Sequence, residues 1–166
     1  MIDSVRIPEE RKAALIGRNG STKNKIEKIA GIQLEIHEND VEIIGEDLNV
    51  IYARDIIKAI GRGFSPKEAL KLLDDDYQLL VLNARDYTTR NLEPVIARLI
   101  GTGGKTRRII EEYTRTHISI YGKTVSIIGT AQDVHIASEA IEMLINGAPH
   151  KNVYIYLENI KAKNKI

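Results

Sequence analysis

The fold of this chain is decided by a repeated stretch, Leu15-Ile16-Gly17-Arg18-Asn19-Gly20-Ser21-Thr22, which returns as Leu99-Ile100-Gly101-Thr102-Gly103-Gly104-Lys105-Thr106. Around it, residues 15–63 align with residues 99–147 at a constant offset of 84 positions and without gaps. Sixteen of the 49 aligned positions are identical, and all but a threonine and a glutamate are apolar residues or glycines, which a shared backbone requires. We therefore expect two copies of one fold.

The apolar spacing within each copy predicts an ordered series of helices and strands. Ile26 and Ile29 are spaced to share one face of the helix after the first glycine stretch, and Ile110 and Tyr113 correspond to them. Alternating apolar residues then predict a half-buried strand, a turn and a second strand. In the first copy we expect a strand at Val5–Ile7, helices at 9–15 and after Gly20, strands around Leu34–Ile36 and at Val41–Ile44, and a helix at Asp47–Ile60. In the second copy we expect a strand at Gln78–Leu82, helices at 91–99 and after Gly104, strands around Ile118–Ile120 and at Val125–Ile128, and a helix at Ala131–Ile145.

This order of elements predicts two domains, a linker between them and a C-terminal extension. Residues 1–64 form the first domain and residues 77–150 the second, each an α+β unit with a three-stranded sheet packed by three helices. The linker, residues 65–76, opens with Ser65-Pro66-Lys67-Glu68, which reads as a helix cap, a proline in the first turn and an acid. Residues 151–166 are expected to form a helix, although the alternation of their apolar side chains would equally allow a strand.

The two glycine stretches have the properties of anion-binding loops. Glycine permits a tight turn and a close approach of backbone to a ligand, and the following helix points its free N–H groups and positive dipole end at the loop. Net charge is only +1 over the whole chain, but it is +5 over residues 11–28 and +3 over residues 98–115. These two basic patches indicate a protein that binds a phosphate backbone.

The composition excludes several other classes of protein. The chain has no cysteine, which rules out disulfide scaffolds, cysteine zinc sites and thiol catalysis. Its four histidines are not spaced as metal ligands, and we expect neither an enzyme nor a cofactor. Gly104-Lys105-Thr106 resembles the end of a P-loop, but that motif needs a glycine where Leu99 stands. No apolar run approaches the ~18 residues of a membrane span, and we expect a cytoplasmic protein.

The order strand–helix–GxxG–helix–strand–strand–helix resembles the type I KH domain, whose GxxG loop clamps a short single-stranded segment. Two tandem copies resemble the Partner-of-Nob-One family of small-subunit ribosome assembly proteins, in its compact archaeal form. The stretches that carry this resemblance are Gly61-Arg62-Gly63-Phe64-Ser65-Pro66, Leu72-Leu73-Asp74-Asp75-Asp76-Tyr77, Ile100-Gly101-Thr102-Gly103-Gly104-Lys105-Thr106-Arg107-Arg108, Ser119-Ile120-Tyr121-Gly122-Lys123-Thr124-Val125 and Gly147-Ala148-Pro149-His150.

The resemblance implies a non-catalytic RNA-binding factor that acts in late maturation of small-subunit ribosomal RNA, near its 3′ end. Its partners would be that RNA, the pre-ribosomal small subunit, and the processing endonuclease or other assembly factors. The second domain would be the principal RNA binder. Eukaryotic relatives typically have a degraded first GxxG, whereas Gly17 and Gly20 are both present here. The first domain is therefore expected either to dock protein or also to bind RNA.

The expected RNA-binding residues are the two loops and the groove beside the second one. Backbone N–H groups of the loop would hold phosphates, and aliphatic side chains would line a shallow base-binding groove. The full set is Gly17, Arg18, Asn19, Gly20, Lys23, Ile100, Gly101, Thr102, Gly103, Gly104, Lys105, Arg107, Arg108, Ile110, Ile118 and Ile120.

Four alternatives remain open at this point. The isoleucines could be plain core, and the lysines after the first loop could be an ordinary solvated helix face. The chain could be a tandem KH protein of another pathway, such as transcription or RNA decay. It could also be a protein-interaction scaffold whose loops no longer hold RNA, which salt-dependent RNA binding would exclude.

Overall fold

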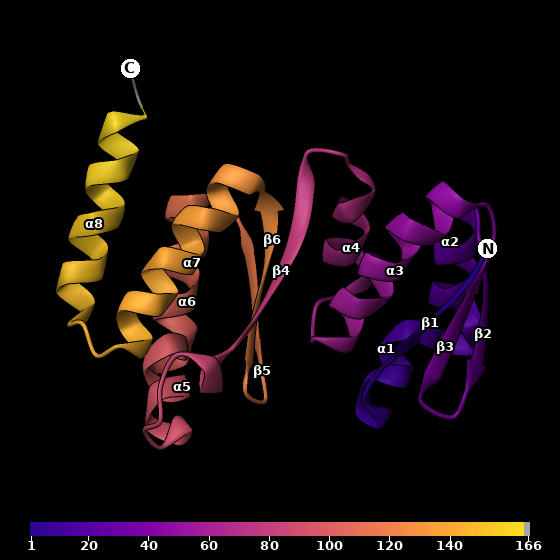
Figure 1. Ribbon diagram of the computed structural model, residues 1–166, viewed down its shortest axis with the longest axis horizontal. Coiled ribbons are helices and arrows are strands. Elements are labelled where there is room, and N and C mark those ends of the chain that lie inside the picture. The colour runs from indigo at the N-terminus through magenta and orange to yellow at the C-terminus, as the bar shows by residue number, and fades with distance from the viewer. Residues whose placement is uncertain (165–166) are drawn as a thin grey trace. The chain divides into compact units, whose positions relative to one another are not determined.

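The computed structural model describes residues 1–164, in which the chain forms two compact units, one at Met1–Leu79 and one that begins at Leu80 (Figure 1). The first unit contains β1 (Ile2–Arg6), α1 (Lys12–Ile16), α2 (Ser21–Ala30), β2 (Gln33–His37), β3 (Asp40–Ile44), α3 (Asp47–Gly61) and α4 (Pro66–Ala69). The second sheet and its helices comprise β4 (Tyr77–Asn83), α5 (Leu92–Ile100), α6 (Lys105–Thr114), β5 (His117–Tyr121), β6 (Thr124–Thr130), α7 (Ala131–Ile145) and α8 (His150–Lys163).

Each unit is built on a three-stranded sheet with the same strand order. The orders are β1-β3-β2 in the first sheet and β4-β6-β5 in the second. The hairpins also share their register, because Glu35 opposes Glu42 in the first and Ser119 opposes Ser126 in the second, each 84 residues further on. The predicted α+β fold of two repeated units is confirmed. β2 and β5 are edge strands, which leaves one backbone edge of each unpaired within its sheet.

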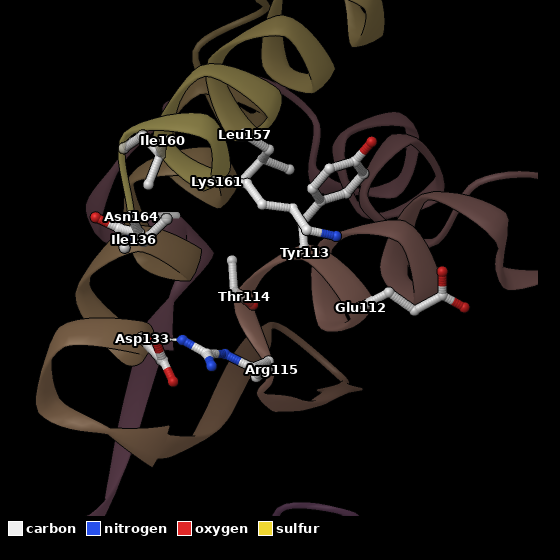
Figure 2. A pocket seen from close by; sticks show the side chains of 10 residues that line it. All are labelled: Glu112, Tyr113, Thr114, Arg115, Asp133, Ile136, Leu157, Ile160, Lys161 and Asn164. Atoms are coloured by element: carbon white, nitrogen blue, oxygen red, sulfur yellow. Dashed lines mark ion pairs between the residues drawn. The ribbon is translucent and has the colours of Figure 1, made fainter. Parts of the chain in front are cut away.

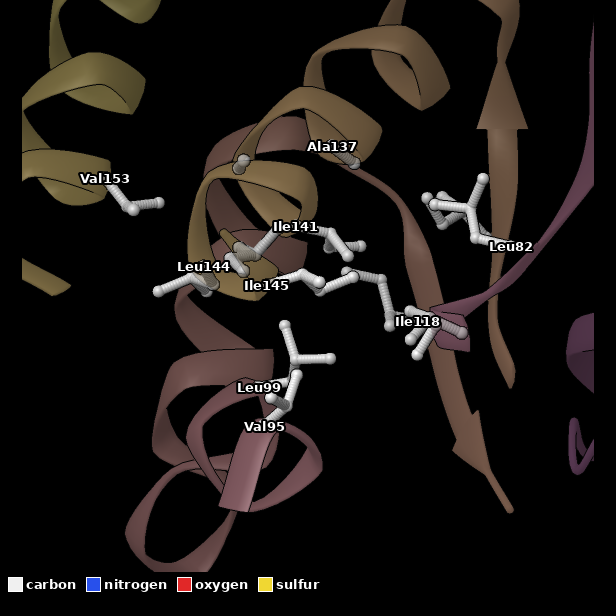
Figure 3. Packing of buried hydrophobic residues seen from close by; sticks show 14 of the residues in the cluster. Leu82, Val95, Leu99, Ile118, Ala137, Ile141, Leu144, Ile145 and Val153 are labelled. Carbon is white, nitrogen blue, oxygen red and sulfur yellow. The ribbon is translucent and has the colours of Figure 1, made fainter. Parts of the chain in front are cut away.

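The core of each unit lies between the sheet and its helices. In the second unit, Val95 and Leu99 of α5 point toward Leu144 and Ile145 of α7, and Ile118 reaches the same cluster from β5 (Figure 3). A fully buried leucine or isoleucine stabilises the folded state by about 1.5–3 kcal/mol. Eight apolar positions that are identical in the two copies lie in both cores or, for Ile36 and Ile120, beside them: Leu15, Ile26, Ile36, Val41, Ile43, Val50, Ala53 and Ile57 with their counterparts 84 residues on.

The first strand and helix differ from the sequence prediction. β1 ends at Arg6 rather than Ile7, although the Ile7 N–H still donates to Asn39 O at 2.9 Å. The expected helix at 9–15 divides into a 3-10 turn at Glu9–Arg11 and the α-helix α1. Pro8 precedes the 3-10 turn in an extended conformation, and a proline ring favours such a tight entry because it fixes φ.

The segments that follow the third helix of each unit are both helical. Ser65 and Glu68 form a reciprocal capping box at the start of α4, as the sequence predicted, and a 3-10 turn follows at Leu70–Leu73. α8 packs on α6 and α7, on the side of the helices away from the sheet (Figure 1). The alternative of a strand in this region is excluded.

Candidate RNA-binding loops

The two GxxG loops have the same backbone conformation. Gly17 and Gly101 have φ of 71° and 75°, and the fourth positions, Gly20 and Gly104, have φ of 76° and 79°. The third position is left-handed in both loops as well, with Asn19 at φ 54° and Gly103 at φ 60°. Asparagine tolerates this region better than other residues with a side chain, so both loops keep the same shape.

The first glycine of each loop is required for two reasons: its φ is positive, and a threonine side chain lies against its Cα. A Cβ atom on Gly17 would lie 2.1 Å from Thr22 Oγ1, and one on Gly101 would lie 2.3 Å from Thr106 Oγ1. Thr22 and Thr106 are the identical threonines of the repeat. By contrast, a Cβ on Gly103 would meet nothing within 4 Å. The first glycine therefore shapes the loop, and the third position faces open space.

Each loop leads into a helix whose first N–H groups have no side-chain cap. Gly20 is the N-cap of α2 and Gly104 that of α6, and neither has a side chain that could accept from the helix. The positive end of the helix dipole lies at the same place. Backbone donors, a positive dipole end and a left-handed glycine turn together favour a phosphate at this position.

The basic side chains around the second loop differ in their surroundings. Lys105 is exposed at the first position of α6. Arg107 pairs with Glu111 at 2.7 Å, and Arg108 donates to the carbonyl of Gly103 at 2.7 Å. Arg108 thus braces the loop in addition to contributing charge. In the first unit, Lys23 Nζ lies 3.5 Å from the carboxylate of Glu27, and this ion pair is equivalent to that of Arg107 and Glu111.

Two glutamates that the sequence reasoning missed connect the loop helix to the edge strand. The carboxylate of Glu27 accepts from the N–H of Leu34 at 2.8 Å, and that of Glu111 accepts from the N–H of Ile118 at 2.9 Å. These bonds hold the helix and strand that flank the expected groove at a fixed separation. The signal was present, since the Ile-Glu pair is identical in the two copies at 26–27 and 110–111.

The isoleucines of the expected groove occupy two different environments. Ile110 and Ile118 are only 1% and 5% exposed and belong to the core of the second unit. Ile100 and Ile120 are partly exposed, on the last residue of α5 and on β5. Of these four isoleucines, only Ile100 and Ile120 therefore have side-chain surface open to a ligand beside the loop.

Two arginines counted in the basic patches hold the ends of the third helices. Arg11 donates to the carbonyls of Ile60 and Phe64 at 2.8 and 2.9 Å, at the end of α3. Arg98 donates to the carbonyls of Leu144, at 2.7 Å, and Ala148, at the end of α7. The four carbonyls correspond at the offset of 84, but the two arginines do not, because Arg11 aligns with Val95.

A hollow lies at the C-terminal end of α6, away from the second GxxG loop (Figure 2). It has a volume of about 350 Å³ between α6, α7 and α8. The ammonium of Lys161 lies 5.2 Å from the centre of the Tyr113 ring, and Arg115 pairs with Asp133 at 3.8 Å. The lining carries two cations, Lys161 and Arg115, and two carboxylates, Glu112 and Asp133, so the hollow has no net attraction for one sign of ligand.

Within residues 1–164, one group of side chains brings three possible metal ligands within 4.8 Å of one another, and it consists of Glu35, His37 and Glu42. They lie across β2 and β3, a juxtaposition that linear spacing does not reveal. Both ion pairs of His37 are exposed, at 3.5 and 3.8 Å, which is ordinary for surface charges. In the Asp74-Asp75-Asp76 run, Asp74 accepts from the N–H of Asp76 at 2.9 Å, as in a turn.

No helix within residues 1–164 combines the length and the apolar character needed to cross a membrane.

Comparison with known proteins identifies both units. A family model described as "eukaryotic type KH-domain (KH-domain type I)" matches residues 9–77 and again residues 78–162. The KH domain-containing protein MJ0443 of Methanocaldococcus jannaschii is 44% identical over 99% of this chain and 76% of its own length. The pre-rRNA-processing protein pno1 of Aspergillus fumigatus is 35% identical over 67% of this chain, and the match spans 46% of that relative.

Two crystal structures from Pyrococcus horikoshii share the fold along almost the whole chain. Dim2p is 43% identical, with a TM-score of 0.91 over 96% of this chain and 99% of its own. A chain in the a/eIF2alpha-aDim2p-rRNA complex is 43% identical, with a TM-score of 0.93 over 98% of this chain and 95% of its own.

Proposed function

Because the chain belongs to the Pno1/Dim2 family of tandem KH-domain pre-rRNA-processing proteins, we propose that it binds single-stranded RNA near the 3′ end of small-subunit ribosomal RNA and assists its maturation. It does so as a non-catalytic assembly factor. Its partners are the pre-ribosomal small subunit, in the cytoplasm, and the processing endonuclease or other assembly factors that act there. The complex of a 43% identical relative with rRNA supports this choice of ligand.

The observation that carries the proposal is the equal backbone geometry of the two GxxG loops. The fold itself requires Gly17, but a Cβ on Gly20 would meet nothing within 4 Å, so packing does not require a glycine there. Gly20 is nevertheless a glycine with φ 76°, against 79° for Gly104, as an intact RNA-binding loop would have. We therefore propose that both units bind RNA. The sequence alone leaves open whether the first unit binds RNA or docks a protein.

In the proposed mode of binding, a phosphate lies against the turn at Gly103, Gly104 and Lys105, at the positive end of the α6 dipole. The N–H groups of Gly104 and Lys105 already donate within the turn, to the carbonyls of Gly101, at 3.1 Å, and Thr102, so they hold the turn in shape for the phosphate. The cations of Lys105, Arg107 and Arg108 add attraction, and these contacts position the strand without reading its sequence. Bases lie against Ile100 and Ile120, beside β5, which is an edge strand of its sheet. The first unit offers Arg18, Asn19 and Lys23 around the equivalent loop.

A titration against short RNA tests this function. We expect tight, selective binding of an RNA from the 3′ end of small-subunit rRNA over a scrambled RNA, weakening as salt increases. The double variant Gly103→Asp/Gly104→Asp should lower the affinity about tenfold or more, because carboxylates replace the open space where phosphates lie. Equal binding of both RNAs would remove the assigned target, and no binding at any salt would indicate a protein scaffold.

Two controls make the titration decisive. Gly103→Asn/Gly104→Asn introduces the same bulk and the same positive-φ strain without charge, so it should retain most of the affinity. Asn19→Asp/Gly20→Asp applies the matched change to the first unit, and a drop in affinity there would support two RNA-binding loops. An unchanged affinity in that variant would assign the first unit to protein docking.

A further inference from the structure

A second binding surface lies beside the second loop, on its α8 side. The hollow has a volume of about 470 Å³, within the range of small-ligand sites. Its walls come from the end of α5, the loop, the first turn of α6 and the first turns of α8. The lining residues are Ala97, Arg98, Gly101, Thr102, Lys105, Thr106, His150 and Tyr154.

The chemistry of this hollow suits a nucleotide. Lys105 provides a cation at its edge, and the rings of His150 and Tyr154 stand 6.2 Å apart at 49° on successive turns of α8. His150 Nε2 lies 3.0 Å from the carbonyl of Arg98, and a carbonyl only accepts, so Nε2 carries the proton. In the neutral ring, Nδ1 is then an acceptor. A cation, an aromatic face and an acceptor are the groups that recognise a phosphate and a base.

The hollow is continuous with the loop that holds the RNA. Gly101, Thr102 and Lys105 belong to both, and the Tyr154 hydroxyl lies 3.3 Å from Thr106 Oγ1, directly behind Gly101. A strand that leaves the loop can thus enter the hollow without crossing the core.

The first unit has no aromatic residue at the equivalent positions. At the offset of 84, Tyr154 aligns with Leu70 and His150 aligns with Pro66. The stacking surface is therefore a property of the second unit alone, whereas the loop itself is shared.

We propose that this hollow binds one further nucleotide of the RNA segment held by the second loop, with the Tyr154 ring as its stacking surface and Lys105 near its phosphate. The inference rests on the proposed function. It extends the RNA contact of the second unit beyond the groove and gives the two units footprints of different length.

The experiment compares RNAs of two lengths on the full chain carrying Asn19→Asp/Gly20→Asp, so that the second loop dominates. One RNA is the shortest segment that binds, and the others are extended by one or two nucleotides at either end. We expect extension at one end to raise the affinity about fivefold or more, as a stacked base does. Tyr154→Leu, which copies the first unit, should abolish this gain while leaving the affinity for the short RNA unchanged.

A fluorescence measurement of base stacking accompanies the affinity measurements. 2-Aminopurine at the added position should lose fluorescence on binding to the parent chain and to Tyr154→Phe, which keeps the ring, but not on binding to Tyr154→Leu. A gain that survives Tyr154→Leu, or no gain at either end, would overturn the inference. An equal loss for short and extended RNA would also overturn it, since Tyr154 would then only support the loop. Binding of the short RNA that survives Gly103→Asp/Gly104→Asp would instead contradict the proposed function.

Discussion

The two units share the loop that binds phosphate but differ in what covers their helices. In the second unit α8 runs for 14 residues over α6 and α7, and Tyr113 is half-buried beneath Lys161. In the first unit the corresponding segment ends with the 3-10 turn at Leu70–Leu73, and Ile29, the equivalent of Tyr113, is 49% exposed. The comparison shows that the loop geometry is independent of how the far ends of the helices are covered.

In both units an arginine binds carbonyl groups at the end of the third helix, but it does so from different positions in the chain. Each helix has one carbonyl in its last turn, Ile60 in α3 and Leu144 in α7, and one just beyond its end, Phe64 and Ala148, that accept from the guanidinium of an arginine. Arg11 and Arg98 reach these carbonyls from aligned positions three residues apart. What the two units have in common is thus the contact and not the residue position.

The largest effect is expected from filling the space beside the first loop glycine. Gly101→Ala places a Cβ against Thr106 at a positive φ, and it should lower the free energy of unfolding by about 2–5 kcal/mol in urea denaturation. Gly17→Ala should cost the first unit a similar amount. Gly103→Ala is the matched control, because it has the positive φ without the clash, and about 1 kcal/mol is expected. Equal costs for Gly101→Ala and Gly103→Ala would contradict the role of the close approach.

An intermediate effect is expected from removing the arginine at the end of the third helix. Arg98→Met leaves two carbonyls without their charged donor and should cost about 2–4 kcal/mol. Arg11→Met should do the same in the first unit. On that background, Ala14→Arg places an arginine where the second unit has Arg98, and it should restore roughly half of the loss. No recovery in thermal unfolding would show that the two contacts are not interchangeable.

The smallest effect concerns two tyrosines bonded to carboxylates. Burial and the hydrogen bond to Glu139 raise the pKa of Tyr156 above its usual value, and the hydrogen bond to Asp75 raises the pKa of the exposed Tyr52. A phenol with a raised pKa in the folded state stabilises the fold fully below about pH 10 and loses that contribution as the pH rises further.

Tyr156→Phe should therefore cost about 1 kcal/mol at neutral pH and reduce the loss of stability above pH 10. Tyr52→Phe should change the same profile less, because its hydrogen bond to Asp75 lies at the protein surface. Unfolding by urea between pH 7 and 11 measures both. A larger change for Tyr52→Phe would reverse the expected order of the two units.

The course of the chain and the position of the loops were predictable from local pattern. Apolar periodicity placed α3 and α7 almost to the residue, and the glycines of the repeat located both loops. β1 and α1 were less well predicted, because Pro8 and the pairing with β3 alter their ends. For the candidate site, Lys105 is exposed as a ligand contact requires, whereas Ile110 and Ile118 lie in the core.

The two copies, the helices and strands of each copy and the positions that need glycine could be predicted from local sequence, because they depend on residues close together along the chain. The roles of Glu27 and Glu111, the use of Arg11 in one unit and Arg98 in the other, the exposure of Ile29 and the hollow beside Tyr154 became visible only in the folded structure. Each of these depends on a contact between different helices and strands, and this holds even for the two glutamates, whose partners are only seven residues away. A periodic pattern carries no information about such partners until the chain has folded.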